Sequence, residues 1–219
     1  MTRPADPEKR PGQPGGARDK NRRRRTRQLL EAGVALFLEQ GIEGTRIDEI
    51  TGRAGVAKGS FYRYFKDKRD LVVSLLEPLR EGFEASTGAC AEALRAAEEE
   101  PDLHAAYTTL GRDLGALVVA HPDALRLYLQ ESHAPARGAT KPVRLLSDRV
   151  IERATELARY AHDNGLLRPF DPALGALSTV GAGERILAAV LSGNYPGDPT
   201  EIPGSVTSLV LDGLRRRQR

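Results

Sequence analysis

The segment from Gly41 to Lys68 constrains the fold more than any other stretch, because two short helical patterns lie on either side of a glycine turn. Before the turn at Gly55, apolar residues recur with the i, i+3 and i+7 spacing of one buried helix face, at Ile47, Ile50 and Ala54. After it, Phe61 and Phe65 stand four residues apart, so both can bury against the same small core. The pattern predicts a helix-turn-helix whose second helix, about Lys58 to Tyr64, would lie in a DNA major groove.

The chain before this segment divides into a tail and a helix. Residues 1–20 hold four prolines and almost no apolar side chains, which predicts a disordered basic tail that cannot offset its ordering entropy by burial. After the arginine run at 22–25, a helical pattern with one apolar face ends at Gly41. An arginine run is often only a solvated helix end. Its place beside the helix-turn-helix favours contact with DNA phosphates instead.

From Lys68 onward the sequence shows only helical patterns, and it has neither β-type alternation nor an internal repeat. The predicted helices cover about 69–97, 103–120, 124–132, 143–163, 172–191 and 205–214. Asp171 followed by Pro172 is typical of a capped helix start. The helix that begins there is rich in glycine and alanine, which favours close approach of another helix. We therefore predict an all-α fold with a basic tail (1–20), a helix-turn-helix domain (21–68) and a larger helical domain (69–219).

Composition and charge limit the class of protein. The apolar fraction of 40% and charged fraction of 29% are ordinary for a soluble globular chain. The single cysteine cannot form an internal disulfide, and no apolar run reaches the roughly 18 residues of a membrane span, so a cytoplasmic protein is expected. Residues 1–68 carry 16 Lys/Arg against 9 Asp/Glu, a net +7, whereas residues 69–219 carry 17 against 21, a net −4. This asymmetry indicates that only the first part meets a polyanion.

The helix-turn-helix segment resembles the N-terminal domain of the tetracycline-repressor (TetR) family. The resemblance covers about Arg25 to Leu76 and is densest at residues 54–68. It rests on an ordered series of residues, namely Phe37, Gly41, Thr45, Ile50, Ala54, Gly55, Val56, Gly59, Tyr62, Phe65 and Lys68. It implies a three-helix DNA-binding domain followed by a helical domain that binds a small-molecule effector and forms a homodimer.

The resemblance implies a set of DNA-binding residues: Thr45, Arg46, Lys58, Gly59, Ser60, Tyr62, Arg63, Tyr64 and Lys68. Thr45 would cap its helix and offer a hydroxyl to a phosphate, and Lys68 would clamp another phosphate. Arg63 could read guanine if it faces the groove. Tyr62 and Tyr64 would contact phosphate or a thymine methyl, although either could be a packing residue instead.

Two positions depart from the family's usual pattern. Ala57 stands where a Ser or Thr commonly caps the recognition helix, so one hydroxyl is missing. Thr51 and Gly52 replace an alanine-led step in the preceding helix, which should loosen that helix slightly.

Beyond Leu79 no motif identifies a site. Four aromatic residues are candidates for an effector pocket, although aromatic residues at helical spacing more often belong to plain core: Phe83, Tyr107, Tyr128 and Tyr160. The four histidines lack metal-ligand spacing, and no cofactor or catalytic motif is present, so we expect neither a metal nor an enzyme. The sequence predicts a homodimeric, effector-responsive transcriptional regulator, most readily a repressor. A helical enzyme and a non-specific architectural DNA-binding protein are the alternatives. The effector, the operator and the role of the basic tail are not indicated.

Overall fold

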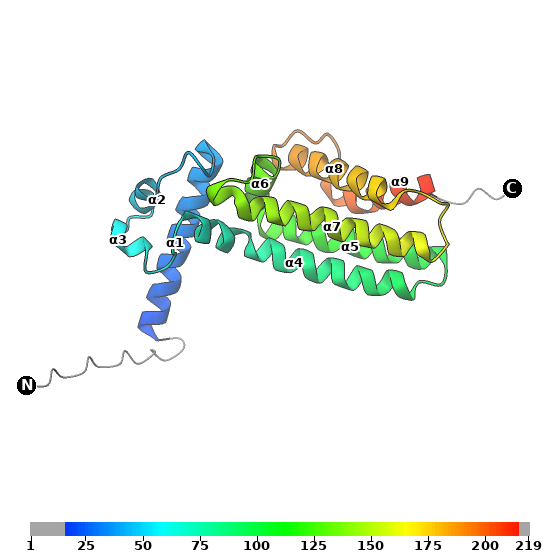
Figure 1. Ribbon diagram of the computed structural model, residues 1–219, viewed down its shortest axis with the longest axis horizontal. Coiled ribbons are helices and arrows are strands. Elements are labelled where there is room, and N and C mark those ends of the chain that lie inside the picture. The colour runs from blue at the N-terminus through cyan, green and yellow to red at the C-terminus, as the bar shows by residue number, and fades with distance from the viewer. Residues whose placement is uncertain (1–15, 215–219) are drawn as a thin grey trace, which may run out of the picture.

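The computed structural model describes residues 16–214, which form helices and no strand (Figure 1). The α-helices are α1 (Ala17–Gln40), α2 (Ile47–Arg53), α3 (Lys58–Phe61), α4 (Lys68–Ala96), α5 (Glu100–Ala120), α6 (Pro122–Glu131), α7 (Lys141–Asp163), α8 (Pro172–Leu191) and α9 (Ile202–Leu214). Short 3-10 helices, η1 (Gly138–Thr140) and η2 (Pro199–Glu201), precede α7 and α9. The predicted all-α fold is confirmed.

The three N-terminal helices lie at one end of an elongated bundle made by α4 to α9 (Figure 1). One apolar core nevertheless runs through both parts. Phe37 of α1 and Phe61 of α3 are fully buried in the same cluster as Leu71 of α4, Leu127 of α6 and Val143 of α7. The boundary predicted after residue 68 therefore cuts through a continuous core. Because such a core is closely packed, a displacement of α4 or α6 would also shift the N-terminal helices.

Local sequence signals predicted several helix ends correctly. The Asp171 carboxylate caps α8 by accepting hydrogen bonds from the N–H groups of Ala173 (2.9 Å) and Leu174 (3.4 Å), with Pro172 as the first helical residue. Gly41 ends α1 with a φ of +78°, and its N–H donates to the Phe37 carbonyl at 2.9 Å. A positive φ is strained for residues with a Cβ, which explains the glycine.

Two predicted boundaries need correction. Residues 1–15 of the predicted tail lie outside the described part of the chain, but residues 17–20 already form the first turn of α1. The predicted second helix of the motif, Lys58–Tyr64, is α-helical only to Phe61. It then tightens, since the N–H groups of Arg63 and Tyr64 donate to carbonyls three residues back, at 3.2 and 2.9 Å. One helical surface still extends over residues 58–64.

Helix α8 is apolar yet poorly covered. Its side chains at Leu174 and Leu177 are 64% and 55% exposed, and within α8 only Ala176 is buried. In residues 16–214 it is the one helix that is long and apolar enough to cross a membrane, a test that apolar helices of soluble proteins also pass. The exposed side of α8 is therefore a candidate interaction surface.

Candidate nucleic-acid interface

Backbone hydrogen bonds and an ion pair between α1 and α2 stabilise the helix-turn-helix internally. The turn passes through Gly55 (φ +64°), and the N–H of Val56 donates to the Thr51 carbonyl at 3.0 Å. The guanidinium of Arg53 at the end of α2 donates two hydrogen bonds to the Glu39 carboxylate of α1, at 2.6 and 2.8 Å. These contacts fix α2 against α1, so that α3 is presented from a rigid support.

The outward side of α3 and of the turn that follows it is a polar surface open to solvent. Lys58, Tyr62 and Arg63 are exposed, with Tyr62 at 55%, while Ser60 is half-buried. A Cβ built on Gly59 would meet nothing within 4 Å, so this position also faces outward. Phe61 and Phe65 lie on the opposite side and are buried, as the sequence predicted. We call Lys58, Gly59, Ser60, Tyr62 and Arg63 the α3 surface.

The Lys58 ammonium is not free in this structure. It forms an ion pair with the Asp48 carboxylate of α2 at 2.8 Å. The hydrogen bond to Asp48 raises the pKa of Lys58 above its ordinary value, so the ammonium stays charged at neutral pH. Both side chains are exposed, and a phosphate oxygen could compete with the carboxylate for the same donor.

At the start of α3, Ala57 occupies the N-cap position without a side-chain hydrogen bond. The expected loss of a capping hydroxyl at this position is therefore confirmed.

The Thr45 side chain does not make the contact that the sequence predicted. Its side chain is 2% exposed, and its hydroxyl donates to the Gly41 carbonyl at 2.8 Å. It does not cap α2, whose N-cap is the exposed residue Arg46; the Arg46 N–H donates instead to the Glu49 carboxylate at 2.7 Å. The expectation of a Thr45 helix cap was wrong: α2 begins one residue later, and the buried Thr45 hydroxyl is satisfied by the carbonyl of Gly41.

Lys68 also has internal partners. Its ammonium donates to the carbonyls of Ile42, Glu43 and Thr45, at 2.6, 3.1 and 2.9 Å. An ammonium has three hydrogens, so these contacts use its full donor capacity. The residue therefore ties the start of α4 to the loop before α2, and the expected phosphate clamp would require these bonds to break. Tyr64, another predicted contact, is half-buried and packs against the apolar core.

A set of contacts that the sequence did not indicate joins this loop to the larger domain. The Glu131 carboxylate of α6 accepts a hydrogen bond from the Ile42 N–H at 3.1 Å. The Glu43 carboxylate accepts from the N–H groups of Ala139 (2.8 Å) and Thr140 (3.3 Å) in η1. The segment around η1, which lies between two of the predicted helices, is thus hydrogen-bonded to the loop before α2. No local signal marks such pairs, because the partners are about 90 residues apart.

The four aromatic effector candidates do not gather around one cavity. The Tyr128 hydroxyl donates to the Glu184 carboxylate at 2.7 Å, and the Tyr107 hydroxyl to the Leu157 carbonyl at 3.3 Å. Tyr160 donates to Glu156 at 2.7 Å and stacks under the Arg95 guanidinium. Phe83 is half-buried on α4. Tyr107 and Tyr160 pack against one apolar cluster, which includes Leu157, whereas Tyr128 belongs to the other.

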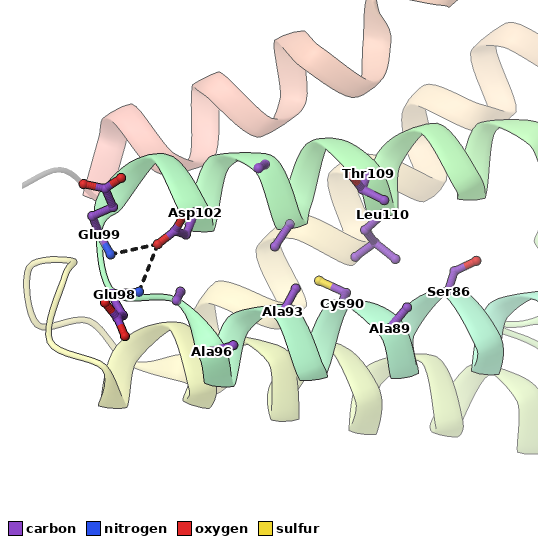
Figure 2. A pocket seen from close by; sticks show the side chains of 13 residues that line it. Ser86, Ala89, Cys90, Ala93, Ala96, Glu98, Glu99, Asp102, Thr109 and Leu110 are labelled. Atoms are coloured by element: carbon purple, nitrogen blue, oxygen red, sulfur yellow. Dashed lines mark hydrogen bonds between the residues drawn. The ribbon is translucent and has the colours of Figure 1, made fainter.

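A cavity of about 890 Å³ lies instead between α4 and α5, as Figure 2 shows. Small side chains of both helices line most of it, and Glu98, Glu99 and Asp102 lie at one end. Its wall includes Cys90, whose burial raises the pKa of the thiol to about 11, so the thiol is neutral and unreactive at pH 7. None of the four aromatic candidates lines this cavity. Among residues 16–214 no three His, Cys, Asp or Glu side chains gather as a metal site.

The helix-turn-helix segment matches a known protein family. Residues 29–75 match the family described as "Bacterial regulatory proteins, tetR family". The transcriptional regulator AcuR of Cereibacter sphaeroides is 40% identical over 77 residues, which cover 35% of this chain and 34% of AcuR. The HTH-type transcriptional repressor KstR2 of Mycobacterium tuberculosis is 39% identical over 49 residues, covering 22% and 24%. The matches thus span about a third or less of these relatives' lengths.

The fold resemblance extends further along the chain. FadR of Bacillus subtilis, solved in complex with stearoyl-CoA, aligns with a TM-score of 0.64 over 86% of this chain and 99% of that one, at 17% identity. Identity at that level indicates a shared fold only. The helix-turn-helix of this chain thus matches the tetR family of bacterial regulatory proteins, and residues beyond it share the fold of FadR.

Proposed function

We propose that the chain is a cytoplasmic, homodimeric transcriptional repressor that binds a pseudo-palindromic operator and is released by a small-molecule effector. The observation that carries the proposal is the α3 surface, where Lys58, Tyr62 and Arg63 stand exposed on a motif that is rigidly packed behind them. Repression is the more specific part of the proposal, and it is supported by the names of relatives such as the repressor KstR2.

The α3 surface supplies groups of the kinds that read DNA. Arg63 can donate two hydrogen bonds to the O6 and N7 atoms of guanine, and Lys58 can reach a base edge or a phosphate. Tyr62 offers a phenol to phosphate or a ring to a thymine methyl, while Ser60 and Gly59 permit close approach of the backbone. Arg46, exposed at the start of α2, would add a phosphate contact.

Thr45, Tyr64 and Lys68 have a different proposed role. Their internal hydrogen bonds and packing support a positioning function, in which they hold the loop before α2 and the base of the α3 surface. They would influence DNA binding through the residues that they position.

The proposed dimer forms through α8. Its exposed leucines, Leu174 and Leu177, can pack against the same helix of a second copy in an isologous interface. Gly181 and Gly183 have open space where a Cβ would be, so two backbones could approach closely there. Two α3 surfaces about 34 Å apart would then enter successive major grooves of the operator.

The proposed effector binds in the larger domain, in the cavity between α4 and α5. Its alanine-rich wall suits an apolar group. Helix α4 lines this cavity and also carries Lys68 at its start, where the ammonium holds the loop before α2. A shift of α4 on effector binding would therefore change the position of the α3 surface, and about 1–3 kcal/mol of coupling is enough for regulation.

The test is selection of duplexes from a random pool by the full chain, followed by titration of the selected duplex and a scrambled one. We expect a strong preference for the selected duplex that persists as salt is raised. Uniform loss of affinity for both duplexes with salt would instead identify a non-specific architectural protein. The variant Lys58→Ala/Tyr62→Ala should lose the preference, whereas Arg112→Ala/Tyr195→Ala, which removes the same residue classes from the larger domain, should keep it.

A further inference from the structure

Helix α1 is longer than its packed part. Its first buried residue is Leu29, and none of residues 18–28 is buried. At 1.5 Å per residue these positions add about 16 Å of helix beyond the core. Figure 1 shows this part of α1 extending past α2 and α3, at the same end of the molecule as the α3 surface. We call residues 18–28 the α1 arm.

The arm is strongly basic, with six arginines and one lysine against a single aspartate. Arg23 pairs with that aspartate, Asp19, at 3.1 Å, and Arg24 donates to the Asn21 side chain at 3.1 Å. By contrast, within the described range the side chains of Arg18 and Arg22 have neither an ion pair nor a hydrogen bond. So many uncompensated charges on one helix destabilise it by repulsion, which a polyanion would relieve.

Three of the arginines continue the buried stripe of α1. Arg18, Arg22 and Arg25 are spaced by four and three residues, and the buried residues Leu29, Ala32 and Leu36 follow at the same alternation. Residues with this spacing lie along one side of a helix. The side of α1 that packs on the helix-turn-helix core with apolar residues therefore presents arginines in the arm, before the first buried residue. Arg23, Arg24 and Arg27 lie on the opposite side of the helix.

The position of α8 indicates where the arm would point relative to the partner copy in the proposed dimer. In Figure 1 the start of α1 and helix α8 lie on opposite sides of the long axis of the molecule. In a dimer joined through α8, the two arms would therefore extend away from the partner copy. Along an operator, this direction leads outward from each half-site.

We propose that Arg18, Arg22 and Arg25 bind the phosphate backbone of the DNA that flanks each half-site. This inference rests on the proposed DNA-binding function and adds a second, sequence-independent contact to the α3 surface. An arm of about 16 Å spans roughly five phosphates of one strand, which are 3.4 Å apart along the axis. Guanidinium groups suit phosphate because they can donate two parallel hydrogen bonds to it.

The test uses the full chain and a duplex selected from a random pool, prepared in two lengths. The long form carries ten additional base pairs of arbitrary sequence on each side, and the short form ends at the selected site. Two triple variants are compared, Arg18→Gln/Arg22→Gln/Arg25→Gln on the stripe and Arg23→Gln/Arg24→Gln/Arg27→Gln on the opposite side. Both remove the same charge from the same arm.

We expect the wild-type chain to bind the long duplex about tenfold or more tightly than the short one, and the stripe variant to bind both equally. The salt slope on the long duplex should fall by about 0.9 for each phosphate that the stripe variant no longer neutralises. The opposite-side variant should keep most of the preference for the long duplex. Its three arginines face away from the bound phosphates, and salt screens charges that lie a Debye length of about 8–10 Å away. Equal binding of both lengths by the wild-type chain, or an equal weakening in the two variants, would overturn the inference and leave DNA reading by α3 intact. If the pool yields no selected sequence at all, the proposed function itself fails.

Discussion

The carboxylate of Glu43, in the loop between α1 and α2, accepts a hydrogen bond from the backbone N–H of Ala139 at 2.8 Å. Ala139 belongs to η1, immediately before α7, so this contact joins the helix-turn-helix to the larger domain. The same carboxylate oxygen lies 3.3 Å from the Thr140 N–H, and Glu131 holds the adjacent residue Ile42. The loop before α2 is therefore held by groups from α4, α6 and η1.

Glu43→Ala should destabilise the chain. A hydrogen bond to a charged acceptor contributes about 1.5–3 kcal/mol, and for a chain of this size each kcal/mol lowers Tm by about 2–4 °C. We expect Tm to fall by several degrees in a thermal melt followed by circular dichroism. Glu31→Ala, which removes an exposed carboxylate from α1, is the control and should leave Tm unchanged. An unchanged Tm in Glu43→Ala would mean that the tether contributes nothing to stability.

Asp48→Asn should strengthen DNA binding. The substitution releases the Lys58 ammonium from its ion pair and removes a negative charge beside the α3 surface. We expect about a two- to fivefold gain in affinity for the selected duplex at low salt, diminishing as salt screens the charges. Fluorescence anisotropy titration at two salt concentrations measures it, with the remote Asp113→Asn as control. Weaker binding by Asp48→Asn would show instead that the Asp48 carboxylate positions Lys58 for DNA.

Helix ends and side-chain partners differ in how far the sequence could predict them. Helix starts and stops are encoded locally, which is why the α8 cap at Asp171 and the end of α1 at Gly41 were predicted correctly. The partners of polar side chains are not encoded locally. Thr45 and Lys68 have residue types suited to phosphate, but the carbonyls that they bind become neighbours only after the chain folds.

Leu174→Glu/Leu177→Glu should convert a dimer into a monomer. Both leucines are exposed on α8, so the substitutions cost little in the single chain but would place charges inside the proposed interface. Sedimentation velocity is the measurement. Leu145→Glu alters another exposed leucine, on α7, and should leave the dimer intact. Dimers of unchanged stability in the α8 variant would exclude this helix as the interface.

Glu84→Gln should reveal a pH-dependent contribution to stability. The Arg149 guanidinium, 2.6 Å away, lowers the pKa of the Glu84 carboxyl from its ordinary value of 4.5. A carboxylate with a lowered folded pKa stabilises the fold above the unfolded pKa and loses that effect as the pH falls through the folded value. We expect the variant to be about 1 kcal/mol less stable in urea at pH 7, and the difference to shrink as the pH falls below 4.5. If the difference in free energy of unfolding between the wild-type chain and Glu84→Gln did not change with pH, the ion pair with Arg149 would not be its cause.

The larger domain was the part least accessible to sequence reasoning. Its helices were predicted from apolar periodicity, but the same periodicity left Tyr107 and Tyr128 as pocket candidates, although such residues more often belong to plain core. In the structure both hydroxyls have partners inside the fold, while the cavity between α4 and α5 is lined largely by alanines, with Glu98, Glu99 and Asp102 at one end. A cavity formed by small side chains can be recognised only once the position of the facing helix is known.

The most direct measurement of DNA reading by the α3 surface is the affinity of the Lys58→Ala/Tyr62→Ala variant for the selected duplex, relative to a scrambled duplex, at physiological salt. We predict that the wild-type chain prefers the selected duplex by about a thousandfold or more and that the variant, folded and dimeric as judged by circular dichroism and sedimentation, retains only its weak non-specific affinity. Full-strength, sequence-specific binding by this double variant would contradict the assignment of Lys58 and Tyr62 to the DNA-reading surface.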